Sequence, residues 1–302
     1  MSRILFFILS IAWISCNKKT EPSALVFQSD FGIKDGAVAA MKGVAFDVCS
    51  EINMYDITHE IPAYDIWEAA YRLHQSAPYW PPGTVFVSVV DPGVGSDRKS
   101  VVLKTKSGHY FVSPDNGTLT LVAEYLEIEA VREIDEKRNR RVHSEQSYTF
   151  HGRDVYAYTG ARLAAGSISF EQVGKVLENK VMAIPYQKAT VDDGKLRGNI
   201  PALDVQYGNV WTNIDQALVH MAGIEKGDSL SVKIYHQQEL IFEGRMPYVN
   251  TFSDVSIGEN LAYANSLMNL SLGINQESFS SRYKVFSGAS WHVEIQKIKT
   301  PK

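Results

Sequence analysis

The sequence predicts an α/β protein, with an N-terminal α/β sheet domain followed by a smaller, mostly antiparallel β-domain. In the first part of the chain, short apolar runs typical of buried strands alternate with longer stretches of helical spacing. Beyond a polar segment at 192–195, apolar residues recur at every second position, as in 230–235, which is the period of strands with one face in water. We therefore place the boundary near residue 190 and predict domains over 24–190 and 191–302.

Each predicted element has its own signal in the sequence. A strand is expected where a short apolar run ends at Gly, Pro or Asp, and a helix where apolar residues recur three or four positions apart. In chain order, we predict strands at 24–28, 52–57, 84–90, 101–104 and 110–112, with helices at 36–48, 64–75, 119–125 and 154–165. The second domain is predicted to hold strands at 230–235, 240–243 and 291–295. Alternating strands and helices are typical of parallel sheets, which bind ligands at the carboxyl ends of their strands.

The composition is that of an ordinary globular protein. The chain has 302 residues, of which 45% are hydrophobic and 21% charged, and this length is enough for two domains. Its net charge of −4 gives no electrostatic reason to expect nucleic-acid binding. The basic cluster at 137–141 is predicted to be a solvated loop, with binding of an acidic partner as the alternative.

Residues 1–23 have the pattern of a signal peptide or lipoprotein anchor followed by a tether. Arg3 precedes an apolar run at 4–14 that is too short to span a bilayer but has the length of a signal-peptide core. Ser15-Cys16-Asn17 resembles a lipoprotein cleavage site, so we expect lipidation of Cys16; a plain signal peptide or an N-terminal anchor is the alternative. This predicts an extracytoplasmic protein anchored to a membrane, on the periplasmic or outer-membrane face. With Cys16 lipidated, only Cys49 remains and no disulfide can form within the chain.

The turn that follows the predicted strand at 84–90 is a candidate active-site segment. Asp91-Pro92-Gly93 ends that strand, Arg98 follows in the same loop, and His151 precedes the helix expected at 154–165. Each residue has a simpler interpretation, because an Asp-Pro-Gly sequence commonly forms a turn and a lone His or Arg before a helix is commonly a cap or a surface group. A carboxylate, a guanidinium and an imidazole near turns of one sheet together indicate a catalytic site.

Asp30 and Asp35 follow the first predicted strand in the same way. Both lie near the start of the helix expected at 36–48, where carboxylates are favoured by free N–H groups and by the helix dipole. Capping is therefore one interpretation. The other is that a carboxylate at the end of a parallel strand binds the two adjacent hydroxyls of a ribose.

The motifs taken together resemble the SAM hydroxide adenosyltransferases, which hydrolyse S-adenosylmethionine (SAM) and are related to fluorinases and chlorinases. The motifs that carry the resemblance are Ser29-Asp30-Phe31-Gly32 with Asp35, Met41-Lys42-Gly43-Val44, Asp56-Ile57-Thr58-His59, Asp91-Pro92-Gly93-Val94-Gly95 with Arg98, Pro114-Asp115-Asn116-Gly117, Phe150-His151-Gly152-Arg153-Asp154, Gly208-Asn209-Val210-Trp211-Thr212-Asn213 and Asn265-Ser266. The resemblance implies cleavage of SAM at the ribose C5′ by water, with adenosine and L-methionine as products. It also implies that Asp91, Arg98 and His151 are the catalytic residues.

The same resemblance assigns the rest of the pocket. Asp30 is expected to bind the ribose hydroxyls, beside Tyr64. Asp35, Asp204 and Ser266 are expected at the methionine end, and Asn209 and Phe252 at the adenine. For the two aromatic residues, packing in the core or at an interface is the alternative.

Three positions distinguish this chain from the fluorinating members. Those relatives have Tyr at the position of Asp91, Ser at the position of Gly152 and Arg at the position of Leu267. The differences favour water over a halide as the nucleophile. A SAM-dependent halogenase and a non-catalytic lipoprotein that binds nucleosides or SAM are the alternative functions.

The resemblance further implies a homotrimer whose pockets lie between the N-terminal domain of one subunit and the C-terminal domain of the next. SAM is then a substrate, and we expect no cofactor. We also expect no metal, since His59, His74, His143 and His151 lack the spacing of metal ligands.

Overall fold

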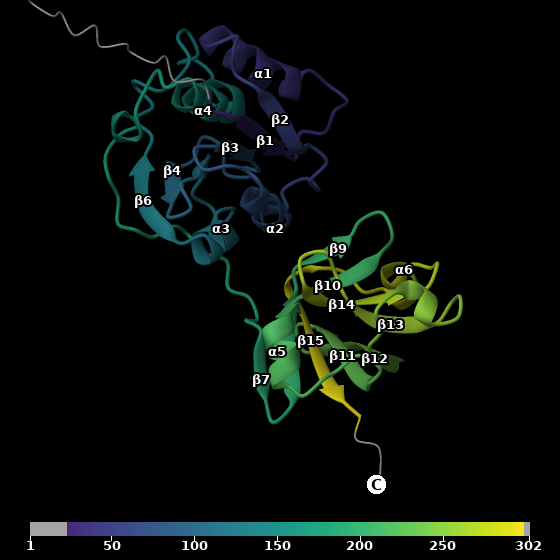
Figure 1. Cartoon of the computed structure of the whole chain (residues 1–302). Coiled ribbons are helices and arrows are strands. Elements are labelled where there is room, and N and C mark those ends of the chain that lie inside the picture. Colours follow the sequence, from purple (N-terminus) through teal and green to yellow (C-terminus); the bar gives the residue numbers. More distant parts are fainter. Residues whose placement is uncertain (1–22, 299–302) are drawn as a thin grey trace, which may run out of the picture.

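The computed structural model describes residues 23–298, which form an N-terminal α/β domain and a C-terminal β-domain (Figure 1). The N-terminal sheet has six strands in the order β2-β1-β3-β5-β4-β6. These strands are β1 (Leu25–Ser29), β2 (Met54–Thr58), β3 (Val85–Val89), β4 (Ser100–Thr105), β5 (Tyr110–Pro114) and β6 (Ile128–Glu133). Strands β2, β1, β3 and β5 are parallel, whereas β4 runs antiparallel between β5 and β6. The expected α/β sheet domain is thus confirmed.

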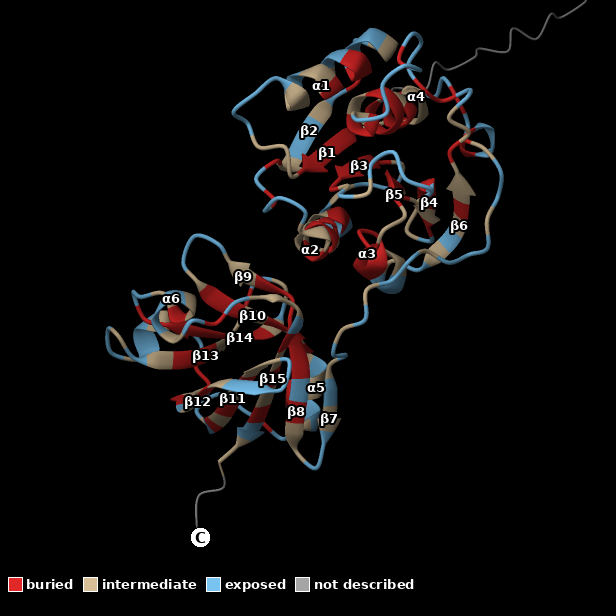
Figure 2. Ribbon diagram, turned by 180° about the vertical axis from the view of Figure 1, so that it is seen from behind, coloured by how far each residue is buried: buried red, intermediate tan, exposed pale blue. Residues whose placement is uncertain are grey.

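Helices cover both faces of this sheet. Helices α1 (Ala37–Val48) and α4 (Tyr158–Ala164) lie on one face, and α2 (Ile66–Ser76) and α3 (Thr120–Tyr125) on the other (Figure 1). Successive side chains of β1 point to opposite faces of the sheet, because side chains alternate along a strand. Leu25 and Phe27 pack with α1 and α4, whereas Val26 packs with α2 and α3. The two central strands β1 and β3 are therefore buried along their whole length (Figure 2).

The C-terminal domain is mostly antiparallel, as expected. One sheet has the order β12-β11-β15-β8-β7 and the other β13-β14-β10-β9. Their bounds are β7 (Thr190–Asp192), β8 (Lys195–Ile200), β9 (Ala202–Asp204), β10 (Asn209–Asp215), β11 (Ser229–His236), β12 (Glu239–Pro247), β13 (Asn260–Ala264), β14 (Asn269–Ile274) and β15 (Gly288–Lys297). Short helices α5 (Gln216–Met221) and α6 (Phe279–Tyr283) lie beside them.

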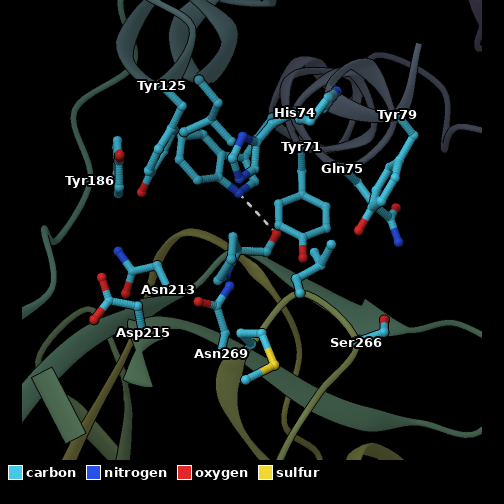
Figure 3. A pocket seen from close by; sticks show the side chains of 16 residues that line it. Tyr71, His74, Gln75, Tyr79, Tyr125, Tyr186, Asn213, Asp215, Ser266 and Asn269 are labelled. Atoms are coloured by element: carbon cyan, nitrogen blue, oxygen red, sulfur yellow. Dashed lines mark hydrogen bonds between the residues drawn. The ribbon is translucent and has the colours of Figure 1, made fainter. Parts of the chain in front are cut away.

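Helix α2 forms much of the contact between the domains. The indole Nε1 of Trp67 donates to the carbonyl of Pro201 at 3.0 Å, and its ring packs beside Tyr186. A cavity of about 370 Å³ remains next to this contact. In it, Tyr71, His74 and Tyr125 of the N-terminal domain lie across from Asn213, Ser266 and Asn269 of the β-domain (Figure 3).

Some predictions concern residues outside the described range. The predicted signal segment and the predicted lipidation of Cys16 fall on residues 1–22, outside the described residues. Over residues 23–298, none of the helices has both the length and the apolar character needed to cross a bilayer.

Candidate active site

A pocket of about 260 Å³ lies at the carboxyl ends of the central strands of the N-terminal sheet. Asp30 follows β1, and Asp91 follows β3 two residues after its last strand residue. His151 enters the same pocket from the start of a π-helical turn (Gly152–Ala157) that runs directly into α4. We call this the strand-end pocket, and Asp30, Tyr64, Asp91, His151 and Gly152 are among the residues that line it.

The three predicted catalytic residues form one connected group. The guanidinium of Arg98 binds Asp91 through two parallel contacts, Nε to Oδ1 at 2.6 Å and Nη2 to Oδ2. Its Nη1 donates to Ser100 Oγ at 3.2 Å, and Nη2 lies 3.3 Å from His151 Nδ1. Because the side chains of Asp91 and Arg98 are only 5% and 11% exposed, this pair is shielded from solvent.

His151 is buried, and its surroundings disfavour the protonated ring. Burial lowers the pKa of His151, and the guanidinium groups of Arg140 and Arg98 lower it further, against the opposing carboxylates of Glu136 and Asp91. Arg140 Nη2 lies 2.9 Å from His151 Nε2 and 2.9 Å from Glu136 Oε2. Each ring nitrogen of His151 therefore faces a guanidinium group.

The prediction that the basic cluster at 137–141 is a solvated loop is wrong for part of the cluster. Lys137, Arg138 and Arg141 are exposed, but Asn139 and Arg140 are buried. Asn139 donates to the carbonyl of Val173 at 2.7 Å, so the loop is fastened inward. The sequence does not show this difference, because the basic residues of the cluster look alike until the fold is known.

Asp30 and Asp35 have different positions. Asp30 lines the strand-end pocket and accepts a hydrogen bond from the backbone N–H of Tyr64 at 2.9 Å through Oδ2. Tyr64 has a positive φ of 71° and its side chain is largely exposed. Asp35 is exposed, does not line the pocket, and accepts from the N–H of Ala37 at 2.9 Å. Within one chain, Asp35 therefore acts as a cap near the start of α1.

The remaining predicted residues meet in a second pocket, of about 820 Å³, which we call the β-domain pocket. Asp204, Asn209, Phe252 and Ser266 all line it. Asn209 Nδ2 donates to Asp204 Oδ2 at 3.2 Å, which orients the amide and the carboxylate together. No residue that lines this pocket also lines the strand-end pocket.

The residues of the β-domain pocket that sequence reasoning missed include Trp211, Tyr263 and Asn265. The Asn265 Nδ2 donor is buried without a partner among the described residues. Burial raises the pKa of Tyr263 to about 12, so its hydroxyl stays protonated near neutral pH. Trp211 and Asn265 do lie in motifs already noted, Gly208–Asn213 and Asn265-Ser266, whereas Tyr263 carries no such signal.

Models of known families match both domains. The SAM hydroxide adenosyltransferase N-terminal domain matches residues 25–174, and the C-terminal domain of the same family matches 198–292. The chain belongs to this family. The (R)-S-adenosyl-L-methionine hydrolase of Methanocaldococcus jannaschii is 39% identical over 217 residues, covering 70% of this chain and 74% of the relative. A fluorinase of Actinopolyspora mzabensis is 29% identical over 89% of this chain and 96% of its own length.

A solved structure supports the same relationship. An uncharacterised conserved protein from Thermotoga maritima has a TM-score of 0.81 and 33% sequence identity, covering 90% of this chain and 99% of that one. Both domains are thus shared with the relative.

The positions that differ from fluorinating members of the family have a structural context here. A Cβ added to Gly152 would lie 3.1 Å from the ring of Phe31 and 3.2 Å from Val89 Cγ1, so a serine here would require these side chains to move by a few tenths of an ångström. Leu267 packs with Trp67 and Tyr71 between the domains rather than lining the β-domain pocket. Neither position offers a polar group to a halide or a carboxylate.

Proposed function

We propose that this protein hydrolyses SAM at the ribose C5′, with water as the nucleophile, to adenosine and L-methionine. The observation that carries the proposal is the connected Asp91, Arg98 and His151 group at the mouth of the parallel strands. The match to both domains of the SAM hydroxide adenosyltransferases supports it. So does the 39% identity to a relative named as a SAM hydrolase.

For this reaction the protein mainly has to align a water molecule with C5′ and accept the proton that the water loses. Water attacks C5′ opposite the sulfur, a C5′–O bond forms, and the C5′–S bond breaks with its electron pair going to sulfur. Methionine leaves as a neutral thioether, so no general acid is needed and one proton must leave the water. Arg98 fixes the Asp91 carboxylate through both oxygens, and His151 is available as a neutral hydrogen-bonding group.

Substrate binding is divided between the two pockets. In the strand-end pocket, Asp30 is suited to the ribose hydroxyls beside Tyr64. In the β-domain pocket, Asn209 and Phe252 offer an amide and a ring to the adenine. Asp204 and Ser266 suit the methionine ammonium, and Asp35 would join them from the other pocket's domain.

In a complete site, one SAM molecule must therefore contact both pockets. We propose that it forms between the strand-end pocket of one subunit and the β-domain pocket of the next, in a homotrimer. The supporting observation is that the two pockets lie in different domains and share no residue within one chain. A ring of identical head-to-tail contacts would assemble the same site at each interface.

The location of the protein is a separate proposal. Cys16, in a sequence that resembles a lipoprotein cleavage site, would carry the lipid, and residues 18–23 would tether an extracytoplasmic enzyme to a membrane.

Product analysis tests the proposed function. The protein starting after Cys16 would be incubated with SAM and chloride, and the products separated by liquid chromatography. We expect adenosine and methionine in equal amounts. A 5′-chloro nucleoside would instead identify a halogenase. No product, together with a melting temperature raised by SAM, would identify a binding protein.

A further inference from the structure

When the His151 ring is neutral, only one of its two nitrogens can accept a hydrogen bond. Arg98 Nη2 lies 3.3 Å from Nδ1, and Arg140 Nη2 lies 2.9 Å from Nε2. A guanidinium group only donates, and a neutral imidazole has one nitrogen with a lone pair and one with a proton. One of the two contacts must therefore set which nitrogen is protonated.

The contact with Arg140 is the better hydrogen bond. The two hydrogens of Arg140 Nη2 are directed at Glu136 Oε2 and His151 Nε2, each at 2.9 Å, and Nη1 reaches the carbonyl of Ser147 at 3.3 Å. Arg98 uses Nε and Nη2 on Asp91 and Nη1 on Ser100, and its distance to His151 is longer. Nε2 is then the acceptor and the proton of the neutral ring lies on Nδ1, so the longer 3.3 Å approach of Arg98 Nη2 to Nδ1 is a contact between two donors and not a hydrogen bond.

We propose that Arg140 is a positioning residue that fixes His151 as the Nδ1–H tautomer, which leaves Asp91 as the proton acceptor. This rests on the proposed function. Arg98 cannot accept a proton, and His151 has its lone pair engaged by Arg140, so only Asp91 remains of the three. As the C5′–O bond forms and the C5′–S bond breaks toward sulfur, the proton of the water passes to an Asp91 oxygen.

Arg140 acts through His151 rather than on the substrate. It does not line the strand-end pocket, its side chain is 6% exposed, and it stacks 4.9 Å from the centre of the Tyr148 ring. The charged groups facing His151 are Asp91, Arg98, Glu136 and Arg140, and the titratable rings beside it are Tyr148 and Tyr156. Removing Arg140 removes one of two cations that oppose protonation of His151, so the pKa of His151 should rise toward its ordinary value.

The test compares Arg140→Met with Arg140→Lys, using the pH dependence of SAM hydrolysis. Protonation of Nε2 would break the contact with Arg140 and place a further positive charge near Asp91, which makes Asp91 a weaker proton acceptor. We therefore expect activity to fall as pH falls through the pKa of His151. For Arg140→Met we expect the acid limb of kcat to move to higher pH by about one unit. We expect KM for SAM to stay within about twofold, because removing a group that only positions another changes kcat. Arg140→Lys keeps the cation and a donor, so its acid limb should stay close to the wild-type position.

The tautomer can be measured independently of activity, by solid-state ¹⁵N spectra of protein labelled at its histidines. The signal of His151 is identified as the one that is lost in His151→Asn. We expect a protonated Nδ1 in the wild type and a changed pattern in Arg140→Met, while Arg141→Met, at the exposed neighbouring position, leaves it unchanged. A protonated Nε2 in the wild type would overturn the inference, as would an acid limb that does not move in Arg140→Met. Protein that shows the Nδ1–H tautomer but does not hydrolyse SAM would reject the proposed function and leave the role of Arg140 in setting the tautomer intact.

Discussion

Replacing Asp91 by Asn should lower kcat for adenosine formation by about 10²- to 10⁴-fold, the range expected when a positioned acid–base group is lost. An amide has nearly the shape of a carboxylate but cannot take a proton from water. It also accepts from Arg98 through one oxygen instead of two, so the guanidinium is held less firmly. Steady-state kinetics with SAM measures the loss, and the affinity for SAM should change much less than kcat.

Asp97→Asn is the matched control for this substitution. Asp97 lies in the same loop and undergoes the same chemical change, but it is exposed and does not line the strand-end pocket. We expect its kcat to stay within about twofold of the wild type, as for surface substitutions generally. If Asp91→Asn were folded and as active as Asp97→Asn, the assignment of Asp91 would be wrong.

Mixing two inactive variants should restore activity, because the proposed site combines pockets from two subunits. Asp91→Asn disables the strand-end pocket and Asp204→Ala disables the β-domain pocket. In a randomly mixed ring, about a quarter of the interfaces would pair an intact strand-end pocket with an intact β-domain pocket. Co-expressed variants with different affinity tags, purified through both tags, should therefore show a large gain in adenosine formation over either parent.

The control for the mixing experiment is the chain that carries both substitutions. Mixed with Asp91→Asn, it supplies no intact strand-end pocket at any interface, so activity should stay at the level of the parents. Native mass spectrometry would show whether the subunits have exchanged. Mixed oligomers with no gain in activity would place both pockets of a working site in one chain.

Much of the fold was predictable because local patterns agree with the tertiary structure. The buried strands β1 and β3 were predicted within one residue at each end, since a short apolar run closed by Asp or Pro has few alternatives. Helix α1 was predicted within one residue for the same reason. The strands that were missed are β6, β7, β8, β9, β10, β13 and β14. Among them, β8 contains Gly198, Pro201 lies between β8 and β9, and polar residues in β8 and β10 obscure the alternation.

The site residues, too, could be predicted only where a local sequence pattern marks them. Asp91 could be located because it ends a strand, and the structure brings Arg98 and His151 to it. Arg140 could not be found, because its role depends on the loop at 137–141 turning inward. Asp35 was predicted as a substrate contact, and this stays a prediction, with capping as the role seen within one chain.

Hydrolysis of SAM in water enriched in ¹⁸O tests the central claim most directly. If water attacks C5′, mass spectrometry should show one ¹⁸O in the adenosine, at the 5′ position, and none in the methionine. The label should also appear at the same fraction as in the solvent, because each turnover uses one water. Unlabelled adenosine, or a nucleoside product without the new oxygen, would contradict the account.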